Sequence, residues 1–80
     1  MARPRVAMPQ DVADALQMSG LCDAYGTRPP YQRNDWLIWI GGAKRPETRA
    51  RRLAAMLAEL RAGHGYMGMP WHPRGTRKQD

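Results

Sequence analysis

The stretch from Pro46 to Ala62 constrains the fold most, because its residues follow the pattern of one amphipathic helix. Its apolar side chains recur at intervals of three and four residues, which places them on one helical face. They are Ala50, Leu53, Ala54, Leu57 and Leu60. Pro46 suits the first helical position and Gly63 follows the last turn as a typical C-terminal signal, so we predict a helix over Pro46–Ala62. Its solvent side is expected to carry Thr48, Arg51, Arg52 and Glu59.

Two shorter helices are predicted before this one. The first, Pro9–Met18, opens with a proline, carries Asp11 in its first turn and stops before Gly20. The second, Leu21–Tyr25, is short and directly follows that glycine. The preceding residues 1–8 are predicted to form a basic N-terminal arm.

The segment from Tyr31 to Ala43 fits either a helix or a strand. As a helix, it would place Trp36, Trp39 and Ile40 on one face. As a strand, it would be a short apolar run, rich in aromatic and β-branched residues, between turn-forming residues. The residues alone leave both structures open.

The size of the chain limits the architectures that remain. Eighty residues allow one small domain, which excludes a Rossmann domain, a (β/α)₈ barrel and a two-domain enzyme. The single cysteine, Cys22, excludes an intramolecular disulfide framework. The longest apolar run, Trp36 to Ile40, is five residues long, and the first residues lack the apolar core of a signal peptide. We therefore expect a soluble cytoplasmic protein without a membrane span.

One motif resembles a known family. Residues 39–52, WIGGAKRPETRARR, follow the pattern W-I-x-x-A-K-R-P-E-T-R-x-R-R of the YdeI/OmpD-associated, or bacteriocin-protection, proteins. Upstream, residues 9–16 match the opening P-x-D-x-x-x-A-L of the same family. Over residues 8–63 the chain resembles the C-terminal helical module of these proteins, whose members usually carry a separate N-terminal β-rich domain as well.

The resemblance implies an all-α fold and a helix, rather than a strand, over Trp36–Ile40. We expect a small bundle of about four helices that ends in an αα-hairpin, formed by residues 31–42 and 46–62, followed by an irregular C-terminal tail. The leucines of the last helix would then pack against the tryptophans of the helix before it. The chain is thus divided into a basic arm (1–8), a helical module (9–63) and a basic tail rich in Gly, Pro and Met (64–80).

A cluster of cations at the start of the last helix is the candidate anion or partner-binding site. Its members are Lys44, Arg45, Arg49, Arg51 and Arg52. Free N–H groups in a first helical turn favour an anion. If Lys44, Arg45, Arg49 and Arg52 bind an anionic partner, we expect them to project outward without carboxylate partners. The structural alternative is that Lys44 and Arg45 complement the carbonyl end of the preceding helix, while Arg51 pairs with Glu47.

The aromatic residues suggest packing more than base stacking. Tyr31, Trp36 and Trp39 have the helical spacing of a core, although a stacking platform for bases is the alternative. In the tail, Tyr66 and Trp71 either fold back over the bundle or anchor a partner.

The sequence favours an interaction module over an enzyme. It contains no recognisable catalytic constellation, and His64 and His72 match no metal-ligand spacing, so we predict no cofactor and no metal. We expect a non-enzymatic interaction module of the bacteriocin-protection type that binds a protein partner. The net charge of +6 supports a nucleic-acid-binding accessory protein as the alternative, and a subunit of a homo-oligomer is the third class.

Overall fold

Four α-helices contain most of the residues described by the structure, a computed structural model that describes residues 7–71. The helices are α1 (Gln10–Ser19), α2 (Cys22–Gly26), α3 (Pro30–Gly41) and α4 (Pro46–Ala62). No strand occurs within residues 7–71, so the all-α prediction is confirmed and the strand alternative for residues 31–43 is wrong. Most of the predicted basic arm and the tail beyond residue 71 lie outside the described residues.

Local signals set the ends of the helices. Proline occupies the first position of both α3 and α4, where the missing N–H costs nothing. At the other end of α4, Gly63 has a φ of 83° and its N–H donates to the carbonyls of Glu59 and Leu60. A left-handed residue of this kind ends a helix, and glycine adopts it without steric cost. Helix α4 therefore has the predicted bounds, and the ends of the other three helices lie within one residue of those predicted.

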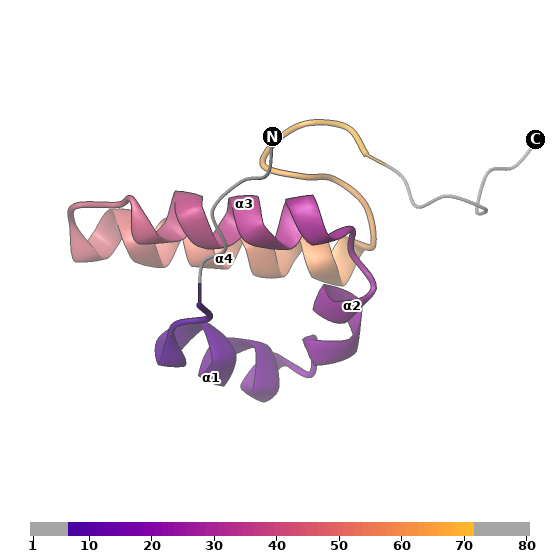
Figure 1. The fold of residues 1–80 in the computed structure, drawn as a ribbon, viewed down its shortest axis with the longest axis horizontal. Coiled ribbons are helices and arrows are strands. Elements are labelled where there is room, and N and C mark those ends of the chain that lie inside the picture. Colours follow the sequence, from indigo (N-terminus) through magenta and orange to yellow (C-terminus); the bar gives the residue numbers. More distant parts are fainter. Residues whose placement is uncertain (1–6, 72–80) are drawn as a thin grey trace, which may run out of the picture.

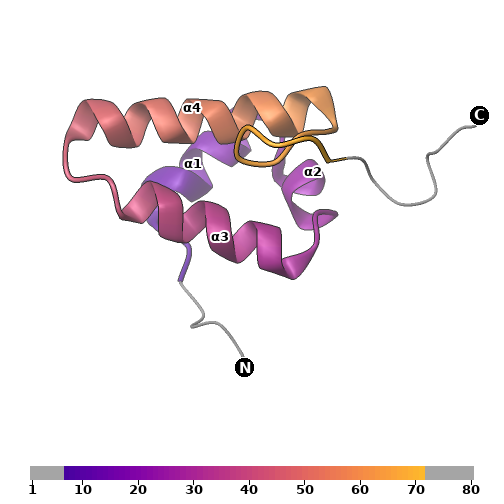
Figure 2. The ribbon, with the colours of Figure 1, turned by 90° about the horizontal axis from the view of Figure 1, so that it is seen from above.

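The helices form two layers. Helices α3 and α4 run antiparallel, side by side, as the predicted αα-hairpin (Figure 1). Helices α1 and α2 lie on one face of this hairpin, where both contact α4 (Figure 2). The α3–α4 connection therefore lies at one end of the molecule, and the α2–α3 connection lies at the other.

The core lies between these layers and is centred on Trp36. Its indole is fully buried, together with Ile40 of the same helix, Val12 of α1 and Met56 of α4. The other buried apolar residues of the core are Leu16, Leu21, Tyr25, Leu37 and Leu60. The prediction that Trp36 is a core residue is therefore confirmed, whereas Tyr31 is 48% exposed.

The face of α4 that packs against the core differs from the predicted apolar stripe. Leu60 is buried as expected, but Leu53 and Leu57 are only half-buried. The most buried residue is Met56, which the prediction left out. The alanines of the stripe, Ala50 and Ala54, are exposed. A methyl group buries little apolar area, so turning Met56 inward stabilises the fold more than burying two alanines would.

Residues 64–71 have no regular helix or strand but form a defined hairpin turn. The backbones of Tyr66 and Met69 exchange two hydrogen bonds of 2.9 Å. Between them, Met67 and Gly68 have φ values of 50° and 81°, as a two-residue turn of this hand requires. Glycine accommodates the second of these angles, and the carbonyl of Trp71 closes the loop by accepting the N–H of Gly65.

Candidate functional site

The five predicted cations surround the α3–α4 connection, but the structure divides them into two groups. Lys44, Arg45 and Arg51 are exposed, whereas Arg49 and Arg52 are half-buried. Arg45 is the N-cap of α4, with extended backbone, and the later arginines follow in the first two turns. We refer to the exposed residues Lys44, Arg45 and Arg51 as the basic junction.

Arg49 joins α1 to the end of the helical hairpin. Its Nε donates to Oδ2 of Asp11 at 2.9 Å, and its Nη2 donates to Oδ1 of the same carboxylate at 3.0 Å. These hydrogen bonds hold the pKa of Asp11 below its ordinary value, because they favour the charged carboxylate. The prediction that Arg49 has no carboxylate partner is therefore wrong. An anion bound by Arg49 would therefore have to compete with Asp11.

Arg52 contacts the carboxyl end of α3. Its Nη1 donates to the carbonyl oxygen of Trp39 at 2.7 Å, and its guanidinium carbon lies 5.3 Å from the centre of that indole ring. Nη1 of Arg49 makes a longer contact, 3.4 Å, with the carbonyl of Ile40. A cation near the last carbonyls of a helix is favourable. The structural alternative assigned this contact to Lys44 and Arg45, but Arg49 and Arg52 make it.

Unlike Arg49 and Arg52, the three residues of the basic junction have side chains without an internal hydrogen-bond or ion-pair partner in the described range. Within residues 7–71, none of their side chains makes a hydrogen bond or an ion pair. In particular, the expected pair between Arg51 and Glu47 does not form in this range. Their charges are therefore available to a partner without the loss of an internal contact.

The two aromatic residues of the tail fold back over the bundle. The ring of Tyr66 meets the rings of Trp36 and Tyr31 edge to face, with centroids 5.8 Å apart in each case. Its hydroxyl donates to Oδ2 of Asp35 on α3. Trp71 lies over the guanidinium of Arg28, 4.3 Å from its carbon to the ring centre. Of the two alternatives for the tail, the structure supports packing on the bundle for both residues.

Glu59 holds this hairpin turn in place. Its carboxylate accepts the backbone N–H groups of Met67 at 2.9 Å and Gly68 at 2.8 Å. It also accepts the indole N–H of Trp36 at 3.2 Å. The prediction that Glu59 faces solvent is wrong, because its carboxylate accepts hydrogen bonds from three donors, one on α3 and two in the turn.

Arg28 is the other residue that binds the turn, and it is 4% exposed. Its Nη1 donates to the carbonyl of Gly65 at 2.7 Å and to Oε1 of Gln32 at 3.0 Å, and its Nη2 donates to the carbonyl of Glu59 at 3.0 Å. The guanidinium lies between two indoles, 5.0 Å from the Trp36 centroid and 4.3 Å from that of Trp71. Burial lowers the pKa of Arg28, and the nearby charge of Glu59 opposes that change.

Sequence reasoning missed both Arg28 and Glu59. Glu59 lies beside Leu60 and three residues after Met56, so centring the inward face on Met56 would have identified it. Arg28 carries no comparable local signal, because the backbone groups it binds lie 31 and 37 residues further along the chain.

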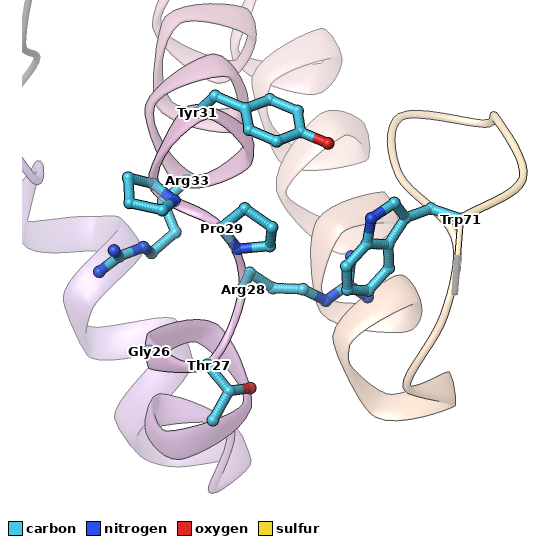
Figure 3. Close-up of a pocket in the computed structure, with 8 residues that line it drawn as sticks. Gly26, Thr27, Arg28, Pro29, Tyr31, Arg33 and Trp71 are labelled. Atoms are coloured by element: carbon cyan, nitrogen blue, oxygen red, sulfur yellow. The ribbon is translucent and has the colours of Figure 1, made fainter. Parts of the chain in front are cut away.

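A pocket of about 760 Å³ opens at the α2–α3 connection (Figure 3). Its lining residues are Gly26, Thr27, Arg28, Pro29, Pro30, Tyr31, Arg33 and Trp71. Two of these are cations, four carry rings and none is acidic. The pocket is at the opposite end of the α3–α4 hairpin from the basic junction.

The described residues form neither a cluster of metal-ligating side chains nor a membrane-spanning helix. Among residues 7–71, no three His, Cys, Asp or Glu side chains are grouped closely enough to hold a metal ion. None of the four helices is long and apolar enough to cross a membrane. His72, for which no metal-ligand spacing was found in the sequence, lies outside this range.

Comparison with known proteins gives one match. A family model described as bacteriocin-protection, YdeI or OmpD-associated covers residues 5–63, most of the chain. This match confirms the resemblance carried by residues 39–52. No curated protein and no solved structure matches the chain.

Proposed function

The chain belongs to the bacteriocin-protection, YdeI or OmpD-associated family, and from this premise we propose that it is a small, non-enzymatic cytoplasmic module that binds a protein partner. The basic junction would contact an acidic face of that partner. The helical bundle would hold these cations at one end of the hairpin.

The observation that carries this proposal is the division of the five cations. Arg49 and Arg52 form the contacts that stabilise the fold, whereas Lys44, Arg45 and Arg51 have none in the described range. Exposed charges without internal partners contribute little to folding. They do contribute to recognition, because complementary charge speeds encounter and orients a partner.

Nucleic acid is the second candidate, favoured by the net charge of +6. A protein that neutralises phosphates releases counterions, so its affinity falls steeply with salt. An acidic protein face gives a weaker dependence on salt, because its charges are fewer and less dense. The two candidates therefore differ in a measurable way.

The test is affinity capture from the native cell extract, with and without nuclease treatment. The wild-type chain is compared with the triple variant Lys44→Gln, Arg45→Gln and Arg51→Gln. We expect the captured protein to remain after nuclease treatment and to be lost with the triple variant. Capture that disappears with nuclease would replace the protein partner with nucleic acid.

A matched pair of single variants controls for the general loss of charge. Arg45→Gln and Arg61→Gln each remove one charge from an exposed arginine of the α4 region. We expect Arg45→Gln to weaken capture more than Arg61→Gln. Equal effects, or full capture by the triple variant, would contradict a role for the basic junction.

A further inference from the structure

We propose that the helical module carries a binding site for a tyrosine-bearing tight turn of a protein partner, and that the chain's own hairpin turn, residues 64–71, occupies this site until the partner displaces it. The turn lies across the α3–α4 hairpin, near α2 (Figure 2). The basic junction lies at the other end of the hairpin, so the proposed function does not depend on this site.

Two charged side chains bind the backbone of the turn. Glu59 accepts the N–H groups of Met67 and Gly68, which are consecutive in the chain. Arg28 donates to the carbonyl of Gly65. Any segment with the same turn geometry offers these backbone atoms. Both charged residues lie in the part of the chain that the family model matches, whereas the turn lies beyond it, so the binding groups belong to the module and the turn is a segment attached to it.

Tyr66 makes the side-chain contacts that give the site its selectivity. Its ring meets the rings of Tyr31 and Trp36 edge to face, and its hydroxyl donates to Oδ2 of Asp35. A phenylalanine would keep the ring contacts but would leave the carboxylate without this donor. The site therefore selects a tyrosine that directly precedes a tight turn.

The turn is held in a way that allows it to be displaced. None of residues 64–71 is buried, since each is exposed or half-buried. Met67 has a φ of 50°, a left-handed conformation that residues other than glycine, asparagine and aspartate rarely adopt, and such turns favour Asn or Gly at this position. The turn therefore depends on Glu59 and Arg28 for its shape more than on its own residues.

The groups that the turn satisfies define what replaces it. Without the turn, Arg28 would lose one carbonyl acceptor and the ring of Trp71, and Glu59 would lose two of its three donors. A polar network that is only partly satisfied is costly. The favoured occupant is thus a partner segment with a carbonyl before its tyrosine and two turn amides after it.

A second copy of the chain could offer the same turn, but the connection to α4 disfavours this exchange. Gly63 ends the helix, with its N–H bonded to the carbonyls of Glu59 and Leu60. The three residues 63–65 span at most about 10 Å when extended, so exchange would bring the ends of two α4 helices close together. Each end carries the exposed Arg61, and these like charges would repel.

The test compares the full wild-type chain with two variants that open the turn. Gly68→Pro removes the N–H that Glu59 accepts, and proline cannot adopt the φ of 81° found here. The space around Gly68 is open, so the added ring clashes with no other side chain. Tyr66→Ala opens the turn by a second route. The probe is a cyclic synthetic peptide that contains the sequence of residues 64–71, since ring closure keeps its turn formed.

We expect both opened chains to bind the peptide with a Kd at least about tenfold lower than that of the wild-type chain, whose own turn competes for the site. Binding should shift the indole signal of Trp36 in ¹⁵N spectra. Equal affinity of the wild-type and opened chains would overturn the role of the turn as an occupant. Absence of binding to both opened chains would overturn the site itself.

Further changes in the Gly68→Pro chain identify the groups that bind. Glu59→Gln should raise the Kd about tenfold or more, as expected for lost charged hydrogen bonds. Glu47→Gln, in an exposed glutamate of the same helix, should leave the Kd within about twofold. A peptide with phenylalanine in place of tyrosine should bind more weakly. Equal effects of the two glutamate variants, or equal binding of the two peptides, would contradict the assigned contacts.

The mass of the wild-type chain in solution decides between a partner and a second copy. We expect light scattering to show a monomer at the concentrations used for peptide binding. A dimer that the peptide dissociates would make a second copy the occupant and would overturn the assignment to a partner.

Discussion

Met56 is the most fully buried side chain of α4. It is fully buried between the helical layers, whereas Leu57, its neighbour in sequence, is half-buried. The periodicity of the sequence identified the helix, but it could not identify which part of a broad apolar face points inward. That orientation depends on α1 and α2, which pack against α4 from one side.

The first prediction compares these two neighbours. Met56→Ala should lower the free energy of unfolding by about 2–5 kcal/mol, because it leaves a cavity that the surroundings fill only in part. Leu57→Ala should lower it by about 1 kcal/mol, since less apolar area is removed from burial. Urea denaturation of both variants measures these values. A loss for Leu57→Ala equal to that for Met56→Ala would contradict the orientation of α4.

The second prediction concerns the ion pair between Asp11 and Arg49. The hydrogen bonds from Arg49 lower the pKa of Asp11 in the folded chain from its ordinary value of 3.8. Their contribution to stability is therefore present above that value and is lost as the pH falls through the lowered pKa. The stability difference between wild type and Asp11→Asn should then be largest near neutral pH and should shrink as the pH falls below 3.8. Urea denaturation of both proteins across this pH range tests the prediction, and a difference that does not change with pH would contradict it.

At the scale of elements, the ends of the helices could be predicted from the sequence, because they depend on residues close together in the chain. Pro46 and Gly63 delimit α4 because a missing N–H and a left-handed φ act locally. The hairpin turn of residues 64–71 was not predicted, because its position depends on Glu59 and Arg28 across long sequence separations. The same reason explains why Arg49 was misassigned, since its carboxylate partner lies 38 residues away.

The third prediction tests how the turn is held. Glu59→Ala removes the acceptor of the Met67 and Gly68 amides and should release the turn from α4. The exchange of these two amide hydrogens with solvent should then become faster, as expected when their hydrogen bonds open more often. Glu47→Ala is the matched control, because Glu47 is an exposed glutamate of the same helix. Unchanged exchange in Glu59→Ala would show that other contacts hold the turn.

At the scale of the whole molecule, the two ends of the α3–α4 hairpin differ in chemistry. One end carries the basic junction above Arg49 and Arg52, and the other carries the pocket around Arg28 and Arg33. Each end combines arginines held by internal hydrogen bonds with arginines whose side chains have no hydrogen bond or ion pair in the described range. We expect the bonded arginines to stabilise the fold, and the proposed function assigns recognition to the basic junction.

The most direct test of this division is the free energy of unfolding of two double variants, each of which removes two arginine charges. Arg49→Gln with Arg52→Gln loses the hydrogen bonds to Asp11 and to the end of α3, so its unfolding free energy should fall clearly. Arg45→Gln with Arg51→Gln loses no side-chain hydrogen bond or ion pair within residues 7–71 and should unfold like the wild type. Equal destabilisation of the two variants, or a neutral effect of the first, would contradict the account.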